Sequence, residues 1–161
     1  DMISDAEGPF SPERSGGLPC FQLADMATQA GVTFPEMMRR MQRKGGLMDW
    51  FGTSDAREIA RRIHEGDGKA ALVYEAMAHN LAKNIGKLAV VTPGRLDAIL
   101  LTGGVARSRM LTDWVAERVS FLAPVHVLPG ENEMVSLALG VLRVLRGEEE
   151  AHTFAERTEA S

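Results

Sequence analysis

The chain has 161 residues, 45% hydrophobic and 25% charged, a balance that suits one globular domain with a sizeable core. Its net charge of −4 argues against nucleic acid or an acidic membrane as a partner, and no apolar run approaches the roughly 18 residues that cross a bilayer. No segment of the sequence predicts a signal peptide, and the single cysteine, Cys20, cannot form an internal disulfide. These features favour a cytoplasmic location.

The first third of the chain predicts a loop followed by short helices. Residues 5–20 are rich in Gly, Pro and Ser and predict an ordered loop rather than a helix or strand. Residues 21–44 predict two short helices, which end at the glycine pair 45–46. The next predicted helix covers residues 55–65. Ser54 or Asp55 can cap it, because either side chain can accept a hydrogen bond from a first-turn N–H group.

Residues 69–91 predict the longest helix. Its apolar residues recur every three or four positions and form one continuous stripe, which predicts that this helix packs at the centre of the core. The stripe consists of Val73, Met77, Leu81, Ile85 and Leu88.

The last third predicts an α/β arrangement. The apolar run at residues 97–101 predicts a buried strand, and residues 125–128 predict a second strand. Each is followed by a predicted helix, at about residues 107–119 and at residues 133–146. The order strand, helix, strand, helix predicts a parallel pair joined by a right-handed crossover. Beyond the last helix, residues 148–161 form a charged tail that we expect to fray.

Two loops leave the carboxyl ends of these strands, where α/β proteins bind ligands. The first contains Gly103 and Gly104, which would let a phosphate approach the backbone at a helix start. Taken alone, this dipeptide is more often a tight turn. The second contains Glu131 and Glu133, which could bind Mg²⁺ or cap a helix with equal plausibility.

Arg14 lies in a loop held between Pro12 and the glycines that follow it, so its guanidinium could point at a transferring phosphoryl group. A surface arginine is the commoner explanation of any single arginine. Asp55 and Arg57 could line a pocket or belong to a solvated helix face. The four histidines show no metal-ligand spacing, and the chain has no P-loop sequence, so metallohydrolases and P-loop kinases are disfavoured.

Several of these segments together resemble butyrate kinases, and the resemblance runs from about residue 5 to residue 152. The similar segments, in order, are EGPFSPERSGGLP, GGLxxxxGTSDAR, VYEAMA, DAILLTGGVARS, ERVSFLAPV, PGENEM and ALGVLRVLRGEEEA. The resemblance implies an α/β fold, the RNase H-like domain of actin-type ATPases, helix-rich with a small mainly parallel sheet. Enzymes of this kind have two such lobes with ATP in the cleft between them.

The resemblance also implies roles for individual residues. Arg14 would be the active-site arginine that stabilises charge on the transferring phosphoryl group. Glu133 would help to hold Mg²⁺, with Glu131 the weaker candidate. The residues implied to border adenosine are Ser54, Asp55, Arg57, Gly103, Gly104, Val105 and Ala106.

The implied reaction is the reversible transfer of the γ-phosphoryl group of ATP to butyrate, giving butyryl phosphate and ADP. A kinase for acetate, propionate or a branched acid is an alternative, as is a non-catalytic module for nucleotide binding or dimerisation. Residues 1–147 would be the C-terminal lobe. The N-terminal lobe would lie upstream of Asp1, so the 161 residues alone are expected to be inactive. A homodimer or higher homo-oligomer is also expected.

Overall fold

The computed structural model describes residues 8–130 and 133–151. The chain divides into two compact units, Asp1–Gly130 and Glu131–Ser161, which are treated separately below. The first unit contains α1 (Cys20–Thr28), α2 (Phe34–Arg43), α3 (Gly46–Phe51), α4 (Ala56–His64), α5 (Gly68–Ala89), β1 (Ile99–Gly103), the 3₁₀ helix η1 (Val105–Arg107), α6 (Arg109–Val119) and β2 (Val125–Pro129). The second contains α7 (Glu133–Leu145).

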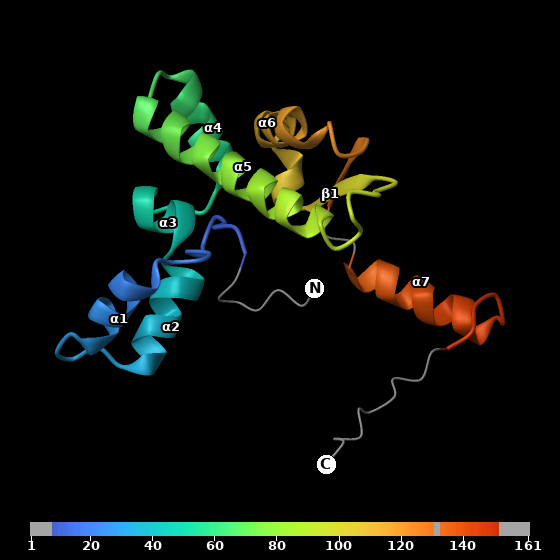
Figure 1. The fold of residues 1–161 in the computed structure, drawn as a ribbon, viewed down its shortest axis with the longest axis horizontal. Helices are drawn as coiled ribbons and strands as arrows, with labels where there is room; N and C mark the ends of the chain where they lie inside the picture. The colour runs from blue at the N-terminus through green and yellow to red at the C-terminus, as the bar shows by residue number, and fades with distance from the viewer. Residues whose placement is uncertain (1–7, 131–132, 152–161) are drawn as a thin grey trace, which may run out of the picture. The chain divides into compact units, whose positions relative to one another are not determined.

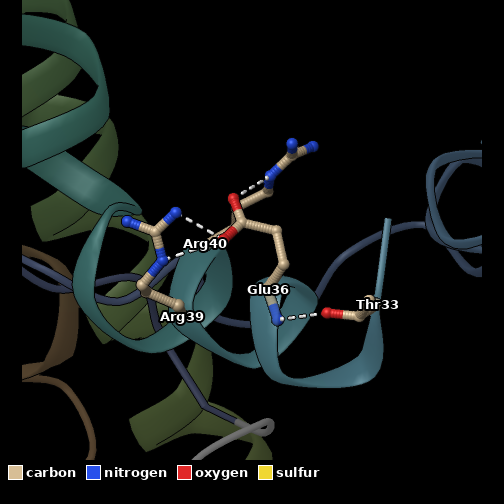
Figure 2. A network of polar contacts seen from close by, with 4 residues as sticks. All are labelled: Thr33, Glu36, Arg39 and Arg40. Carbon is tan, nitrogen blue, oxygen red and sulfur yellow. Dashed lines mark hydrogen bonds and ion pairs between the residues drawn. The ribbon is translucent and has the colours of Figure 1, made fainter. Parts of the chain in front are cut away.

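The two short helices predicted between residues 21 and 44 are confirmed as α1 and α2. The Thr33 hydroxyl caps α2 by accepting a hydrogen bond from the Glu36 N–H at 3.4 Å, and a proline occupies the first turn. Glu36 also accepts hydrogen bonds from the guanidinium groups of Arg39 and Arg40, which lie three and four residues further along the helix (Figure 2). These bonds hold the pKa of Glu36 below its usual value.

Helix α5 is the central packing element, as predicted. Asp67 caps it, because its carboxylate accepts a hydrogen bond from the Ala70 N–H at 3.0 Å. The predicted stripe is wrong in the last turn, where Leu88 is 36% exposed and Ala89 is buried instead. The buried face also carries small residues that the stripe omitted, so that neighbouring elements can approach closely. The buried residues of α5 are Ala70, Val73, Tyr74, Met77, Ala78, Ala82 and Ala89.

Helix α6 packs against α5 and forms the largest helix contact of the core (Figure 1). Its buried residues include Leu111, Val115 and Val119, which belong to one hydrophobic cluster with the buried face of α5. The rings of Tyr74 and Trp114 meet edge to face, with centroids 6.1 Å apart. The pairing of the two helices therefore contributes many of the buried residues of the core of the first unit.

The predicted parallel pair is confirmed. Strands β1 and β2 are parallel, with Ile99 opposite Val125 and Gly103 opposite Pro129. The prediction that the first strand is buried is wrong for one of its faces, because Ile99 and Leu101 are buried while Leu100 is 60% exposed. An alternating pattern of this kind is what a sheet covered on one side shows.

Helix α7 is the described helix of the second unit. Its large apolar residues, among them Met134, Leu137 and Val141, are exposed within that unit. Among the described residues, no helix is both long and apolar enough to cross a membrane.

Candidate functional site

The glycine turn at the end of β1 has the geometry of a tight strand exit. Gly103 has φ of +84°, a conformation that L-residues with a side chain rarely adopt. Its carbonyl accepts a hydrogen bond from the Gly130 N–H at 3.3 Å, which ties the ends of the two strands together. A Cβ at Gly103 would meet no atom within 4 Å, so the space beside this backbone is open. The turn therefore combines a required glycine with an accessible backbone.

The two strand-end loops leave the same edge of the sheet, as the parallel pair predicts, because Gly103 is paired with Pro129. Of the two glutamates predicted in the second loop, Glu131 lies outside the described residues. Glu133 is the first residue of α7, in the second unit. Within the described part of the chain, no group of three or more His, Cys, Asp or Glu residues is arranged to hold a metal ion.

The helix expected at about residues 107–119 is confirmed as α6, which begins at Arg109. A 3₁₀ turn at Val105–Arg107 lies between it and the glycines. The Ser108 hydroxyl caps α6 by accepting a hydrogen bond from the Leu111 N–H at 3.4 Å. Nearer the glycines, the N–H groups of Arg107 and Ser108 donate to the carbonyls of Gly104 at 3.2 Å and Val105 at 3.0 Å, so they are already paired. Ala106 is buried at 6% exposure. The accessible part of this turn is Gly103 to Val105.

The segment around Asp55 forms the start of α4, and of the two caps considered Asp55 is the one observed. Its carboxylate accepts a hydrogen bond from the Arg57 N–H at 2.9 Å and is paired with the Arg57 guanidinium at 2.7 Å. The guanidinium of Arg57 lowers the pKa of Asp55 to about 2. The side chain of Arg57 is 92% exposed, so its planar face is open to a ligand while its charge is paired with Asp55.

Arg14 lies in a loop whose backbone is held at several points. Its N–H donates to the Ser11 hydroxyl at 3.1 Å, and its carbonyl accepts from the Ser11 N–H at 3.0 Å. The next residue, Ser15, donates its N–H to the Met41 carbonyl at the end of α2 at 2.8 Å. The side chain of Arg14 is exposed. The prediction of an ordered loop is thus confirmed for residues 8–19, and the arginine is carried by a fixed backbone.

Helix α3 connects two of the predicted site segments. The loop of Arg14 contacts its amino-terminal end, and the segment with Ser54 and Asp55 follows its carboxyl-terminal end at Gly52. The glycine turn shares the same core with them, since Phe10 packs against the cluster that includes Leu101. In the sequence, Gly45 and Gly46 predicted the end of a helix and belonged to the segment GGLxxxxGTSDAR of the family resemblance, which assigned them no structural role. Two adjacent glycines followed by an apolar residue were the available signal that another backbone approaches there.

Known proteins are similar to this chain over most of its length. The model of the acetokinase family matches residues 6–130. Butyrate kinase 2 of Clostridium acetobutylicum is 44% identical over 150 residues, covering 93% of this chain and 42% of that protein. A probable butyrate kinase of Bacteroides thetaiotaomicron is 50% identical over 144 residues, covering 89% and 41%. The chain therefore spans about two fifths of the length of these curated relatives.

Solved structures show the same fold. The crystal structure of Porphyromonas gingivalis acetate kinase matches with a TM-score of 0.72 at 22% identity, covering 84% of this chain and 41% of that one. The acetate kinase of Entamoeba histolytica matches with a TM-score of 0.71 at 23% identity, covering 85% and 43%. These likenesses confirm the predicted fold class, a helix-rich lobe of the actin-like ATPase fold with a small parallel sheet. On the family match and the identity to its relatives, the chain belongs to the acetokinase family.

Proposed function

We propose that the chain is the C-terminal part of a butyrate kinase, which transfers the γ-phosphoryl group of ATP reversibly to butyrate and yields butyryl phosphate and ADP. The observation that carries the proposal is sequence identity to two relatives over about nine tenths of the chain. The identity is 44% to a butyrate kinase and 50% to a probable butyrate kinase. The full-length protein is this chain joined to the N-terminal lobe that the proposal requires.

In the proposed reaction, a carboxylate oxygen of butyrate attacks the γ-phosphorus of ATP. A phosphorus–oxygen bond forms to the acid as the bond to the leaving oxygen of ADP breaks. Such transfers are accelerated mainly by positioning and by neutralising charge on the phosphoryl oxygens. Arg14 is suited to this role, since a guanidinium stays protonated and the backbone that carries it is fixed by Ser11 and Ser15.

The adenosine side of the site is assigned to two segments. Gly103, Gly104 and Val105 would lie against the nucleotide, because no Cβ at Gly103 obstructs the approach. Ala106 would anchor this turn, because its side chain is buried. Ser54, Asp55 and Arg57 would border the adenine and ribose, where the exposed guanidinium of Arg57 can stack on a base.

Magnesium enters with the nucleotide in this proposal. Mg²⁺ bound to ATP takes most of its ligands from phosphate and water, so one or two protein carboxylates suffice. Glu133 is assigned to this role, and Glu131 is the alternative. The ion would neutralise charge on the phosphate oxygens.

The assay that tests the function offers the full-length protein ATP and a series of acids, and traps the acyl phosphate as a hydroxamate. Butyrate should give the highest kcat/KM. Preference for acetate, propionate or a branched acid would retain the carboxylate kinase and change its substrate. Absence of acyl phosphate with every acid would overturn the proposed function.

The proposal carries two further expectations, a cytoplasmic location and assembly into a homodimer or higher homo-oligomer. A contact surface is favoured by Leu72, Val90 and Val91, large apolar residues that are exposed along and just after α5. Sedimentation of the chain with and without ADP tests the alternative of a non-catalytic module. A dimer would support a role in dimerisation, and a monomer that ignores ADP would mean that this lobe needs its N-terminal half to bind nucleotide.

A further inference from the structure

The loop that carries Arg14 is attached to the start of α3 by its own backbone. We call residues 11–17 the arginine loop. Three consecutive carbonyls of this loop accept hydrogen bonds from the amino-terminal turn of α3. Glu13 accepts from the Gly45 N–H at 2.9 Å, Pro12 from the Met48 N–H at 2.9 Å and Ser11 from the Leu47 N–H at 3.4 Å. The loop thus satisfies donors that the first turn of any helix leaves unpaired.

Two glycines make this contact possible. A Cβ at Gly46 would lie 1.7 Å from the Ser11 carbonyl oxygen and 2.9 Å from that of Arg14. A Cβ at Gly45 would lie 2.4 Å from the Ser15 nitrogen and 2.9 Å from the Arg14 carbonyl carbon. All of these neighbours are backbone atoms, which cannot rotate out of the way as the end of a side chain can. The arginine loop would have to move if either glycine gained a side chain.

Both sides of this contact are firmly held. Leu47, the residue after the glycine pair, is fully buried in the core, so α3 cannot easily retreat. At the other end of the loop, Gly17 donates its N–H to the Gly8 carbonyl at 3.2 Å, and Phe10 packs against the core. A displacement forced at the glycine pair would therefore be taken up between these anchors, where Arg14 lies.

Backbone conformation alone does not explain the glycine pair. Gly46 has φ of +60° and so favours glycine, but Gly45 has φ of −93°, which any residue adopts. Gly66, by contrast, has φ of +92°, and a Cβ there would meet nothing within 4 Å. The requirement at Gly45 is thus one of space for the arginine loop, and Gly66 offers a control with backbone strain but no such contact.

We propose that Gly45 and Gly46 are positioning residues for phosphoryl transfer, because their missing side chains let the backbone of the arginine loop lie on α3 and so place Arg14. This inference rests on the proposed function of Arg14. A group misplaced by about 1 Å loses on the order of 100-fold in rate. A Cβ at Gly46 would lie 1.7 Å from the Ser11 carbonyl oxygen. To restore an ordinary carbon–oxygen separation, the loop would have to move by more than about 1 Å.

The test measures kcat and the KM for ATP of the full-length protein with butyrate. Gly46→Ala should lower kcat by about 100-fold and Gly45→Ala by at least about 10-fold, each with the KM for ATP within about 3-fold of wild type. Gly66→Ala, the matched control, should keep kcat within about 2-fold. Melting temperatures of all variants are recorded, and assays are run well below the lowest of them.

A second readout separates positioning from a general loss of structure. In an Arg14→Ala background, Gly45→Ala should lower kcat no further, because the group that it displaces is already gone. An equal fold-loss in both backgrounds would overturn the inference, as would a normal kcat in folded Gly45→Ala and Gly46→Ala proteins. Failure of both variants to fold would also overturn it, since the pair would then serve folding alone.

These outcomes are distinct from failure of the proposed function. Wild-type protein that makes no acyl phosphate, or Arg14→Ala protein with a normal kcat, would contradict the proposed function itself. Active wild-type protein, an impaired Arg14→Ala variant and unimpaired glycine variants would contradict only the role of Gly45 and Gly46.

Discussion

At the scale of single residues, Arg14 has the most direct proposed role in the chemistry. Its side chain is exposed, while its backbone is bonded on both sides to Ser11. The side chain lies at the surface, and the fixed backbone limits the positions that the guanidinium can take. Both properties are needed in a group that stabilises a transition state rather than simply binding an anion.

Replacing Arg14 by Ala should lower kcat with butyrate by about 1,000-fold in the full-length protein, because the charge on the transferring phosphoryl group is no longer neutralised. The KM for ATP should change far less. Steady-state kinetics measure both values. Arg61→Ala serves as the control, because Arg61 is an exposed arginine of α4 that is paired with Glu65. This variant should keep a normal kcat. An unchanged kcat in the Arg14 variant would remove Arg14 from the mechanism.

The pairing of Asp55 with Arg57 predicts a dependence of stability on pH. Hydrogen bonds and charge from Arg57 lower the pKa of Asp55 from 3.8 to about 2 in the folded protein. A carboxylate with a depressed folded-state pKa stabilises the fold above its unfolded-state pKa, and that contribution disappears as the pH falls through the folded value. The effect should be small, because the pair is on the surface.

Asp55→Asn keeps a side chain that can cap α4 but loses the ion pair. Its melting temperature should lie below that of wild type at pH 7 and should converge with it as the pH falls from about 4 towards 2, a window set by the two pKa values of Asp55. Melting curves across this range test the idea. Asp55→Ala, which loses the cap as well, should remain less stable than wild type throughout. A constant difference between wild type and Asp55→Asn would show that the ion pair is not its source.

At the scale of elements, the contact between α5 and α6 dominates the core. Sequence periodicity identified α5 correctly because an apolar stripe is a local property of one helix. It failed at Leu88, whose exposure depends on where the neighbouring elements end. The alanines of α5 were also missed, since a small side chain carries a weak hydrophobic signal and is buried here because it lets another element approach.

Leu111 and Leu72 provide a matched pair for testing this core. Leu111 of α6 is 2% exposed, and Leu72 of α5 is 69% exposed. Leu111→Ala should lower the free energy of unfolding by about 3 kcal/mol, because it removes buried methyl groups and leaves a cavity. Leu72→Ala should change it by less than about 0.5 kcal/mol. Urea denaturation measures both. A similar loss in the two variants would indicate that Leu72 is covered in the assembled protein.

At the scale of the whole molecule, the chain accounts for about two fifths of its curated relatives. The 161 residues alone should therefore produce no butyryl hydroxamate, because the proposed site needs groups from the N-terminal lobe as well. The same assay on the full-length protein is the positive control. Turnover by the isolated chain would contradict the two-lobe proposal, and calorimetric titration with ADP would show whether the chain binds nucleotide by itself.

The sequence by itself determined helices α1, α2, α4, α5, α6 and α7, the two strands and their parallel order, because periodicity, caps and turn glycines act between residues close in the chain. It did not predict α3, and the family follows from the resemblance of several ordered segments. Its site residues follow from resemblance, and their roles remain predictions. Only the tertiary structure decided that Leu100 is exposed, that a 3₁₀ turn precedes α6 and that Gly45 and Gly46 lie under the arginine loop. The last contact joins backbones about 30 residues apart. The only sign of such a contact in a sequence is a glycine where the two backbones meet, because a side chain would not fit there.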